Sequence, residues 1–275
     1  MSGSKSESHH SKAHDDSQSF EEFAAGAYIE RIINMAQNSD VHLQHISQQF
    51  NTELRDLRNH VLVMGGLVEK QVSDATLSLV NADSELAQLV RQTEDDIDKL
   101  EVTIDEECTR VIAKRQPTAS DLRLVMGVAK MVSDLERIGD EAEKIAKIGI
   151  RLTEEGQAPR GYVEVRHISN HVGQMVHDAL DAFTRFDLDL ALRVMKEDKA
   201  VDTEYKSAMR SLVTFMMEDP RNITGILNII WVLRSLERIG DHSRNICEHV
   251  IYMVKGKDVR HASLEKAEQI IEDKR

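Results

Sequence analysis

Eight acidic residues of the chain stand in four pairs, and the two members of each pair are four residues apart. On an α-helix such residues share one face, about 6 Å from each other, where two like charges are mildly destabilising unless a cation bridges them. Carboxylate sites without cysteine favour hard or borderline cations such as Mg²⁺, Mn²⁺, Ca²⁺ or iron. The sequence therefore predicts acidic metal sites made of Glu94, Asp98, Glu136, Asp140, Asp198, Asp202, Glu237 and Asp241.

An internal repeat relates these pairs. The hexapeptide LERIGD at 135–140 recurs at 236–241, a shift of 101 residues, and each copy contains one pair. A shift of 104 relates the other two pairs, and the difference falls in a loop, where insertions belong. With 48 acidic residues in the chain, single pairs also arise by chance on solvated helix faces. Recurrence in both halves favours the metal interpretation and indicates a tandem duplication, although a duplication also copies residues without function.

Each hexapeptide also carries a glycine and an arginine. Gly139 and Gly240 fall in mid-helix, where glycine is about 1 kcal/mol less favourable than alanine. Their presence indicates close approach of another helix or of a ligand. Arg137 and Arg238 can pair with the acid three residues further on, as helix-surface residues do, or contact a partner. We take these two arginines as candidate partner-binding residues.

Apolar residues three and four apart predict long helices that position the pairs. The apolar stripes cover residues 46–79, 86–111 and 122–149 in the first half, and 168–186, 188–215 and 223–253 in the second. The segment 153–161 reads as a linker. We therefore expect an all-α fold of two tandem antiparallel three-helix bundles, residues 39–153 and 162–256. Residues 1–38 should form a polar, disordered extension with room for a short helix, and residues 257–275 a polar tail.

Composition limits the function. The chain has 35 basic and 48 acidic residues, a net charge of −13, which disfavours nucleic acid unless a basic patch is hidden, and favours cations and basic protein partners. Its longest wholly apolar run, 61–68, is too short to span a bilayer. The two cysteines, Cys108 and Cys247, fall in helical patterns and are expected to be buried, reduced thiols.

No pattern assembles a nucleophile with a base, and HExxH, Walker and GxSxG motifs are absent from the sequence. Glu164-x-x-His167 resembles half of a ferritin-like di-iron motif but has no counterpart in the other half. We therefore expect a protein that is not an enzyme. A carboxylate-bridged metalloenzyme and a purely structural helical scaffold remain the alternatives.

The paired LERIGD motifs, in DLERIGDEAEKIA and SLERIGDHSRNICEHVIYMVKG, resemble the PhoU family of phosphate-signalling proteins. The segments Asp105–Pro117, Ser120–Arg123 and Phe215–Pro220 match that family as well, and the resemblance covers about residues 42–261. It implies two tandem three-helix bundles. It also implies metal clusters of iron or zinc on E(D)xxxD pairs, which fall on the same four acidic pairs.

The resemblance further implies a role. Members of the family are cytoplasmic, lie at the inner membrane through their partners, and often form homodimers. They couple the phosphate ABC transporter, through its ATPase subunit, to a sensor histidine kinase, and hold the phosphate-starvation regulon off when phosphate is plentiful. The expected function is therefore a negative regulator of that regulon, with Mg, Mn, Fe or Zn as candidate metals.

Overall fold

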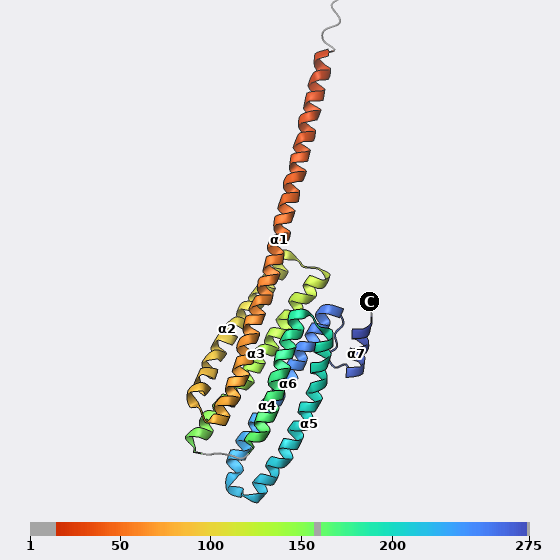
Figure 1. Ribbon diagram of the computed structural model, residues 1–275. Helices are drawn as coiled ribbons and strands as arrows, with labels where there is room; N and C mark the ends of the chain where they lie inside the picture. Colours follow the sequence, from red (N-terminus) through yellow and green to blue (C-terminus); the bar gives the residue numbers. More distant parts are fainter. Residues whose placement is uncertain (1–14, 157–160, 274–275) are drawn as a thin grey trace, which may run out of the picture. The chain divides into compact units, whose positions relative to one another are not determined.

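The computed structural model describes the backbone of residues 15–156 and 161–273, and side chains from residue 48 onward. This part of the chain is helical (Figure 1) and divides into two units, residues up to 52 and residues 53–275, of which the second holds the bundles. Its elements are α1 (Asp15–Asn81), α2 (Ser84–Arg115), α3 (Ala119–Glu154), α4 (Tyr162–Arg185), α5 (Leu188–Glu218), the short 3₁₀ helix η1 (Pro220–Asn222), α6 (Ile223–Lys255) and α7 (Leu264–Glu272).

Local sequence signals set the helix ends at equivalent points of the two halves. Asp83 accepts a hydrogen bond from the backbone N–H of Leu86 at 2.9 Å, and Asp187 accepts one from Leu190 at 2.9 Å. Both aspartates thereby occupy an N-terminal donor that the helix itself leaves unpaired. At the other end, α6 stops at Gly256, whose φ of 68° suits a glycine C-cap.

Three long helices per half bury the predicted apolar stripes. In the first half α2 packs on α3, and the C-terminal part of α1 reaches α2 through Arg115, which binds Glu53 at 2.7 Å. In the second half α6 contacts both α4 and α5. The core consists of fully buried aliphatic side chains such as Val68, Ile97 and Leu135. The expected all-α fold of two tandem three-helix bundles is confirmed.

The two bundles meet along two seams, and equivalent helices face each other in both. In one seam α1 lies against α4: the hydroxyls of Thr76 and Ser169 are 2.7 Å apart. The positions related to them by the 104-residue shift, Leu180 and Gly65, also meet, since a Cβ on Gly65 would lie 2.5 Å from Leu180 Cδ2. In the other seam α3 lies against α6. This reciprocity is that of an isologous interface between two copies of one unit.

The two ends of the chain differ from expectation. α1 begins at Asp15, so the short helix expected within an otherwise disordered extension is the start of one long helix; proline is absent from 15–81 and could not break it. Residues 1–14 lie outside the described part. The expected polar tail instead holds α7, capped by Ser263 and docked on α5, with Val259 and Ala267 fully buried. Among the described helices, none is long and apolar enough to cross a membrane.

Candidate functional site: two carboxylate clusters

The structure brings together the two acidic pairs predicted in the first half. Glu94 and Asp98 lie on α2, and Glu136 and Asp140 lie on the neighbouring α3. Burial raises the pKa of Glu94 to about 7, against the hydrogen bond from Gln71, and the charges of Asp98 and Asp140 raise it further. The pKa of Glu136 is raised by burial and by its acidic neighbours, Asp140 and Asp98 among them. We call these four residues the first carboxylate cluster.

The second half repeats the arrangement. Asp198 and Asp202 lie on α5, and Glu237 and Asp241 lie on α6. Burial raises the pKa of Asp241, and the charges of Asp198 and Asp202 add to the increase. Burial likewise raises the pKa of Glu237, with Asp241 as the strongest acidic neighbour. These four residues form the second carboxylate cluster, so both clusters concentrate negative charge where water screens it poorly.

The clusters differ in how far the chain neutralises them. In the second cluster Arg244 contacts Asp198 at 3.2 Å and Arg234 contacts Glu237 at 2.7 Å. In the first cluster Lys144 reaches Asp140 at 3.5 Å. Within the described part of the chain, no basic side chain lies within 4 Å of the other three acids of the first cluster. The first cluster therefore retains the larger unbalanced charge and the greater attraction for an added cation.

Gly139 has a different structural role from its repeat equivalent. A Cβ at Gly139 would lie 2.7 Å from Oε2 of Glu94 and 3.0 Å from Oε1 of Gln71. The glycine thus makes room for a buried polar pair in which Gln71 Nε2 donates to Glu94 Oε2 at 2.6 Å. At Gly240 the nearest atoms to such a Cβ, from Val201 and Met175, are at least 3.7 Å away. Gly139 thus leaves space for a buried carboxylate in the first half, whereas Gly240 allows only ordinary contact between helices in the second.

The donor atoms of the first cluster suit a hard or borderline cation in kind. Glu94 is 7% exposed, and its Oε1 is buried without a hydrogen-bond partner, as is Oε1 of Gln71. Such orphaned acceptors would each be satisfied by a cation or by a proton. Among the described residues, however, no three His, Cys, Asp or Glu side chains are already arranged around a common metal position. Binding would therefore require side-chain rotation within the cluster.

The two candidate partner-binding arginines lie in different surroundings. Arg137 is exposed on α3, as expected. Arg238 does not pair with Asp241 on its own helix; its guanidinium instead crosses the seam to Glu141 of the first bundle, at 2.8 Å. Glu141 is only 3% exposed, so its carboxylate needs this cation. Arg238 therefore pairs across the seam and not with the acid three residues further on, while partner binding by either arginine stays a prediction.

A buried network across the α3/α6 seam escaped the sequence reasoning. The carboxylate of Asp134 pairs with Nδ1 of His242 at 2.9 Å and Nε2 of His249 at 2.9 Å, and accepts a hydrogen bond from Asn245 at 3.1 Å. Burial alone would raise the pKa of Asp134, but these hydrogen bonds hold it well below its usual range. The two histidines stand seven residues apart, two turns along one face of α6. That spacing was the available signal.

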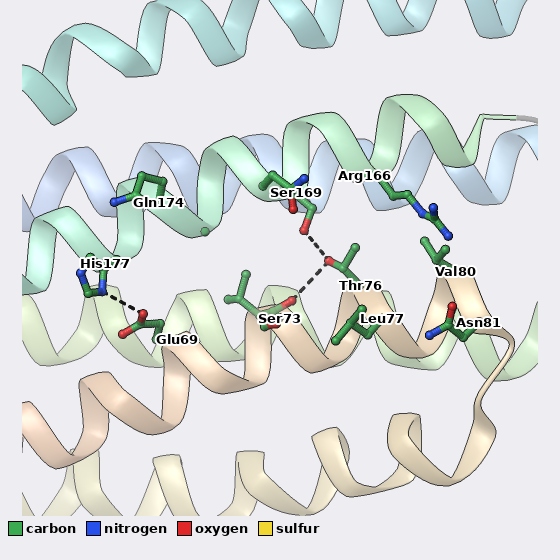
Figure 2. Close-up of a pocket in the computed structure, with 13 residues that line it drawn as sticks. Glu69, Ser73, Thr76, Leu77, Val80, Asn81, Arg166, Ser169, Gln174 and His177 are labelled. Carbon is green, nitrogen blue, oxygen red and sulfur yellow. Dashed lines mark hydrogen bonds and ion pairs between the residues drawn. The ribbon is translucent and has the colours of Figure 1, made fainter.

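A groove with a volume of about 710 Å³ lies in the α1/α4 seam. Figure 2 shows its two walls, joined by the Thr76–Ser169 hydrogen bond and, towards one end, by Glu69 and His177, whose atoms are 2.9 Å apart. Its lining mixes hydroxyl, amide and aliphatic side chains, with Arg166 as its one arginine or lysine. This groove brings together none of the predicted site residues.

Cys108 and Cys247, as expected, are buried and free, and burial raises both thiol pKa values.

Comparison with known proteins supports one family. The model of the PhoU domain matches residues 61–149 and 165–250, once in each bundle. A phosphate-specific transport system accessory protein PhoU homolog of Pseudomonas aeruginosa is 62% identical over 238 residues, 86% of this chain and 98% of that protein. The phosphate-specific transport system accessory protein PhoU of Escherichia coli K12 is 47% identical over 231 residues, 84% of this chain and 95% of that protein.

Solved structures agree. The crystal structure of PhoU from Pseudomonas aeruginosa superposes with a TM-score of 0.74 at 64% identity, covering 76% of this chain and all of that one. The phosphate transport system regulatory protein PhoU from Streptococcus pneumoniae gives a TM-score of 0.70 at 30% identity, covering 76% of this chain and 99% of that one. The duplicated domain, the LERIGD motifs and these matches lead to one conclusion: the chain belongs to the PhoU family.

Proposed function

We propose that the protein is a non-enzymatic accessory regulator of phosphate-specific transport, which represses the phosphate-starvation regulon when phosphate is plentiful. The observation that carries the proposal is 62% identity, over nearly the whole length of the relative, to a protein named as an accessory to that transport system. In this role the protein binds the transporter's ATPase subunit and a sensor histidine kinase at the inner membrane, as a homodimer. It passes the state of one partner to the other.

Such coupling requires that a partner bind differently in the two phosphate conditions. Its size is typically 1–3 kcal/mol, or about 5- to 150-fold in affinity. The exposed Arg137, beside the first carboxylate cluster, supports a role as a contact for an acidic partner surface. Arg238 is a poorer contact because Glu141 already occupies its guanidinium.

Deletion of the gene tests the regulatory role. We expect a strain without the protein to express alkaline phosphatase in phosphate-rich medium, where the enzyme is normally silent. Arg137→Glu should reproduce part of this loss without unfolding, since changes at an exposed site usually cost less than about 0.5 kcal/mol. Arg210→Glu, at an exposed position on α5, is the matched control. A silent reporter in the deletion strain would contradict the proposal and favour a structural scaffold.

The second part of the proposal is that the carboxylate clusters bind metal ions of the Mg, Mn, Fe or Zn type, the first cluster more tightly. Its support is the unbalanced charge of four gathered carboxylates and the orphaned Oε1 of Glu94. The metal would offset the mutual repulsion of the acids and link α2 to α3. These residues bind and position it; the proposal assigns them no catalytic step.

Elemental analysis after metal loading and dialysis tests this part. We expect the double substitution Asp98→Asn and Asp140→Asn to remove most of the metal bound in the first bundle, because two of four carboxylates lose their charge. The substitution of Glu154 and Glu155 by Gln removes the same charge from exposed positions at the end of α3, and should leave metal content unchanged. Equal loss in both variants would mean non-specific surface binding. Turnover of phosphate esters or of Fe²⁺ by the loaded protein would instead support a metalloenzyme.

A further inference from the structure

A second groove lies in the α3/α6 seam, beside both carboxylate clusters, since its lining residues Lys144 and Arg234 reach Asp140 and Glu237. Its volume is about 520 Å³, within the range of small-molecule sites. One wall is the C-terminal part of α3 and the other is the N-terminal half of α6, and each presents residues at relative positions 0, 3, 4 and 7, which share one helix face. We call it the basic groove, because its charged side chains are dominated by Lys144, Lys147, Arg151, Arg234 and Arg238.

The five cations of the basic groove outnumber the four acids that pair with them, although the chain carries a net charge of −13. Lys147 binds Glu143 at 2.6 Å, Arg234 binds Glu237 at 2.7 Å, and Lys144 reaches Asp140 at 3.5 Å. Glu141 is its only acidic lining residue, and that carboxylate is buried between Arg238 at 2.8 Å and Lys144 at 3.1 Å. Its charge is thus already balanced and presents little repulsion to an anion. Arg151 is exposed and, in the described part of the chain, forms no ion pair. An anionic ligand would therefore find a guanidinium that has no competing partner.

An aromatic ring stands beside these cations. Trp231 is the only tryptophan of the chain, lines the groove and is 63% exposed. An indole left this far in water is a surface on which a flat heterocycle can stack, a contact worth about 1–3 kcal/mol for a nucleobase. The groove thus combines a stacking surface with donors that suit phosphate oxygens, of which arginine can bind two at once.

The opposite end of the same seam provides an internal comparison. Under the 101-residue shift Trp231 corresponds to Lys130, and Lys147 corresponds to Glu248. Ser235, which lines the basic groove, corresponds to Asp134, the centre of the histidine network. That end also holds a pocket, of about 420 Å³, lined by Asp134, Asn245, Glu248 and His249 together with Arg244, Arg260 and His261, but its lining includes no indole. Duplication therefore left a hollow at both ends of the seam, while the indole and the guanidinium of Arg151 occur at this end only, since Trp231 corresponds to Lys130 and Arg151 to Tyr252.

We propose that the basic groove binds a nucleoside polyphosphate, with the base stacked on Trp231 and the phosphates held first by Arg151, and then by Lys147, which exchanges its partner Glu143 for a phosphate oxygen. The groove is sized for one small molecule. A ligand that suits it carries a flat ring to stack on the indole and several negative charges to bind the cations, and a nucleoside polyphosphate has both. This binding site goes beyond the regulation of phosphate transport and stands independently of it.

Fluorescence of the single tryptophan reports binding directly. The full chain is titrated with ATP, ADP, AMP, adenosine and tripolyphosphate in EDTA, so that no metal links a phosphate to the carboxylate clusters. We expect ATP to quench Trp231, and affinity to rise with the number of phosphates. Calorimetry should show tripolyphosphate binding at least about tenfold more weakly than ATP, because it lacks a base to stack. Lack of binding by every nucleotide, or equal affinity for tripolyphosphate and ATP, would overturn the proposal.

Two variants locate the site. Arg151→Glu should weaken ATP binding at least about tenfold, since it replaces an unpaired cation with an anion. Trp231→Ala should do the same when binding is measured by calorimetry. Arg166→Glu makes the same charge change in the α1/α4 groove and should leave ATP binding unaltered. Circular dichroism confirms that each variant is folded. An equal effect of the two arginine substitutions would mean attraction by overall charge, and would refute a built site.

Discussion

Replacing Asp134 with alanine should lower the free energy of unfolding by about 3–5 kcal/mol, the largest effect expected of any single substitution considered. The carboxylate of Asp134 accepts hydrogen bonds from three side chains of α6, those of His242, Asn245 and His249. Alanine would leave these groups in the seam without their acceptor, and a buried donor without a partner costs about 1–3 kcal/mol. Urea unfolding at pH 7 measures the loss.

Ser235→Ala is the control, because Ser235 is the repeat equivalent of Asp134 and is also buried in the α3/α6 seam. Ser235→Ala should lower the free energy of unfolding much less than Asp134→Ala does. The pKa of Asp134 is lowered by its partners, so its contribution is present above the ordinary value of 3.8 and is lost as the pH falls below about 4. The difference in the free energy of unfolding between wild type and Asp134→Ala should therefore become smaller at acid pH. A loss at pH 7 no larger than that of Ser235→Ala would contradict the network's importance.

Replacing Glu94 with glutamine should stabilise the metal-free protein at alkaline pH by up to about 3 kcal/mol. Burial and neighbouring carboxylates raise the pKa of Glu94 from 4.5 to about 7. The folded state then holds a proton that the unfolded state has released, so this residue's contribution to stability falls as the pH rises from about 4.5 to about 7. Glutamine carries no charge and can still accept the hydrogen bond from Gln71, so the variant lacks this decline.

Urea unfolding at pH 5 and pH 8 in EDTA measures the effect as the change in the difference between variant and wild type. Glu106→Gln removes an exposed carboxylate from the same helix, and its difference from wild type should stay nearly constant. If the stabilities of Glu94→Gln and Glu106→Gln change alike with pH, then the fold does not raise the pKa of Glu94 and the prediction is wrong. Added metal should reduce the advantage of Glu94→Gln, since a cation stabilises the charged form.

Much of the fold was predictable because it rests on local signals. Apolar residues at helical spacing indicated the six long helices, and the aspartates at equivalent positions 83 and 187 marked two helix starts. The gathering of both carboxylate clusters was also predictable. Helices joined by a short connection are antiparallel neighbours, so pairs placed symmetrically about that connection must meet.

What the sequence could not provide were contacts between the bundles. Arg238 and Glu141 are 97 positions apart, and helical spacing alone favoured the acid on the same helix. The basic groove has the same origin: its cations come from two helices in different bundles, and the net charge of −13 conceals them. The start of α1 at Asp15 was missed because polar composition was taken for disorder, and α7 because its apolar face is short.

The reciprocal seams have an evolutionary consequence. A symmetric pair of separate subunits must use the same residues at both ends of its interface, so any change at one end appears at the other. Once the two copies are joined in one polypeptide, this constraint disappears. One end of the α3/α6 seam now holds the hydrogen-bond network centred on Asp134, while the other holds the exposed indole of Trp231 and the unpaired Arg151. The fused ancestor could thus assign cohesion and recognition to separate ends, a division of labour closed to a true homodimer.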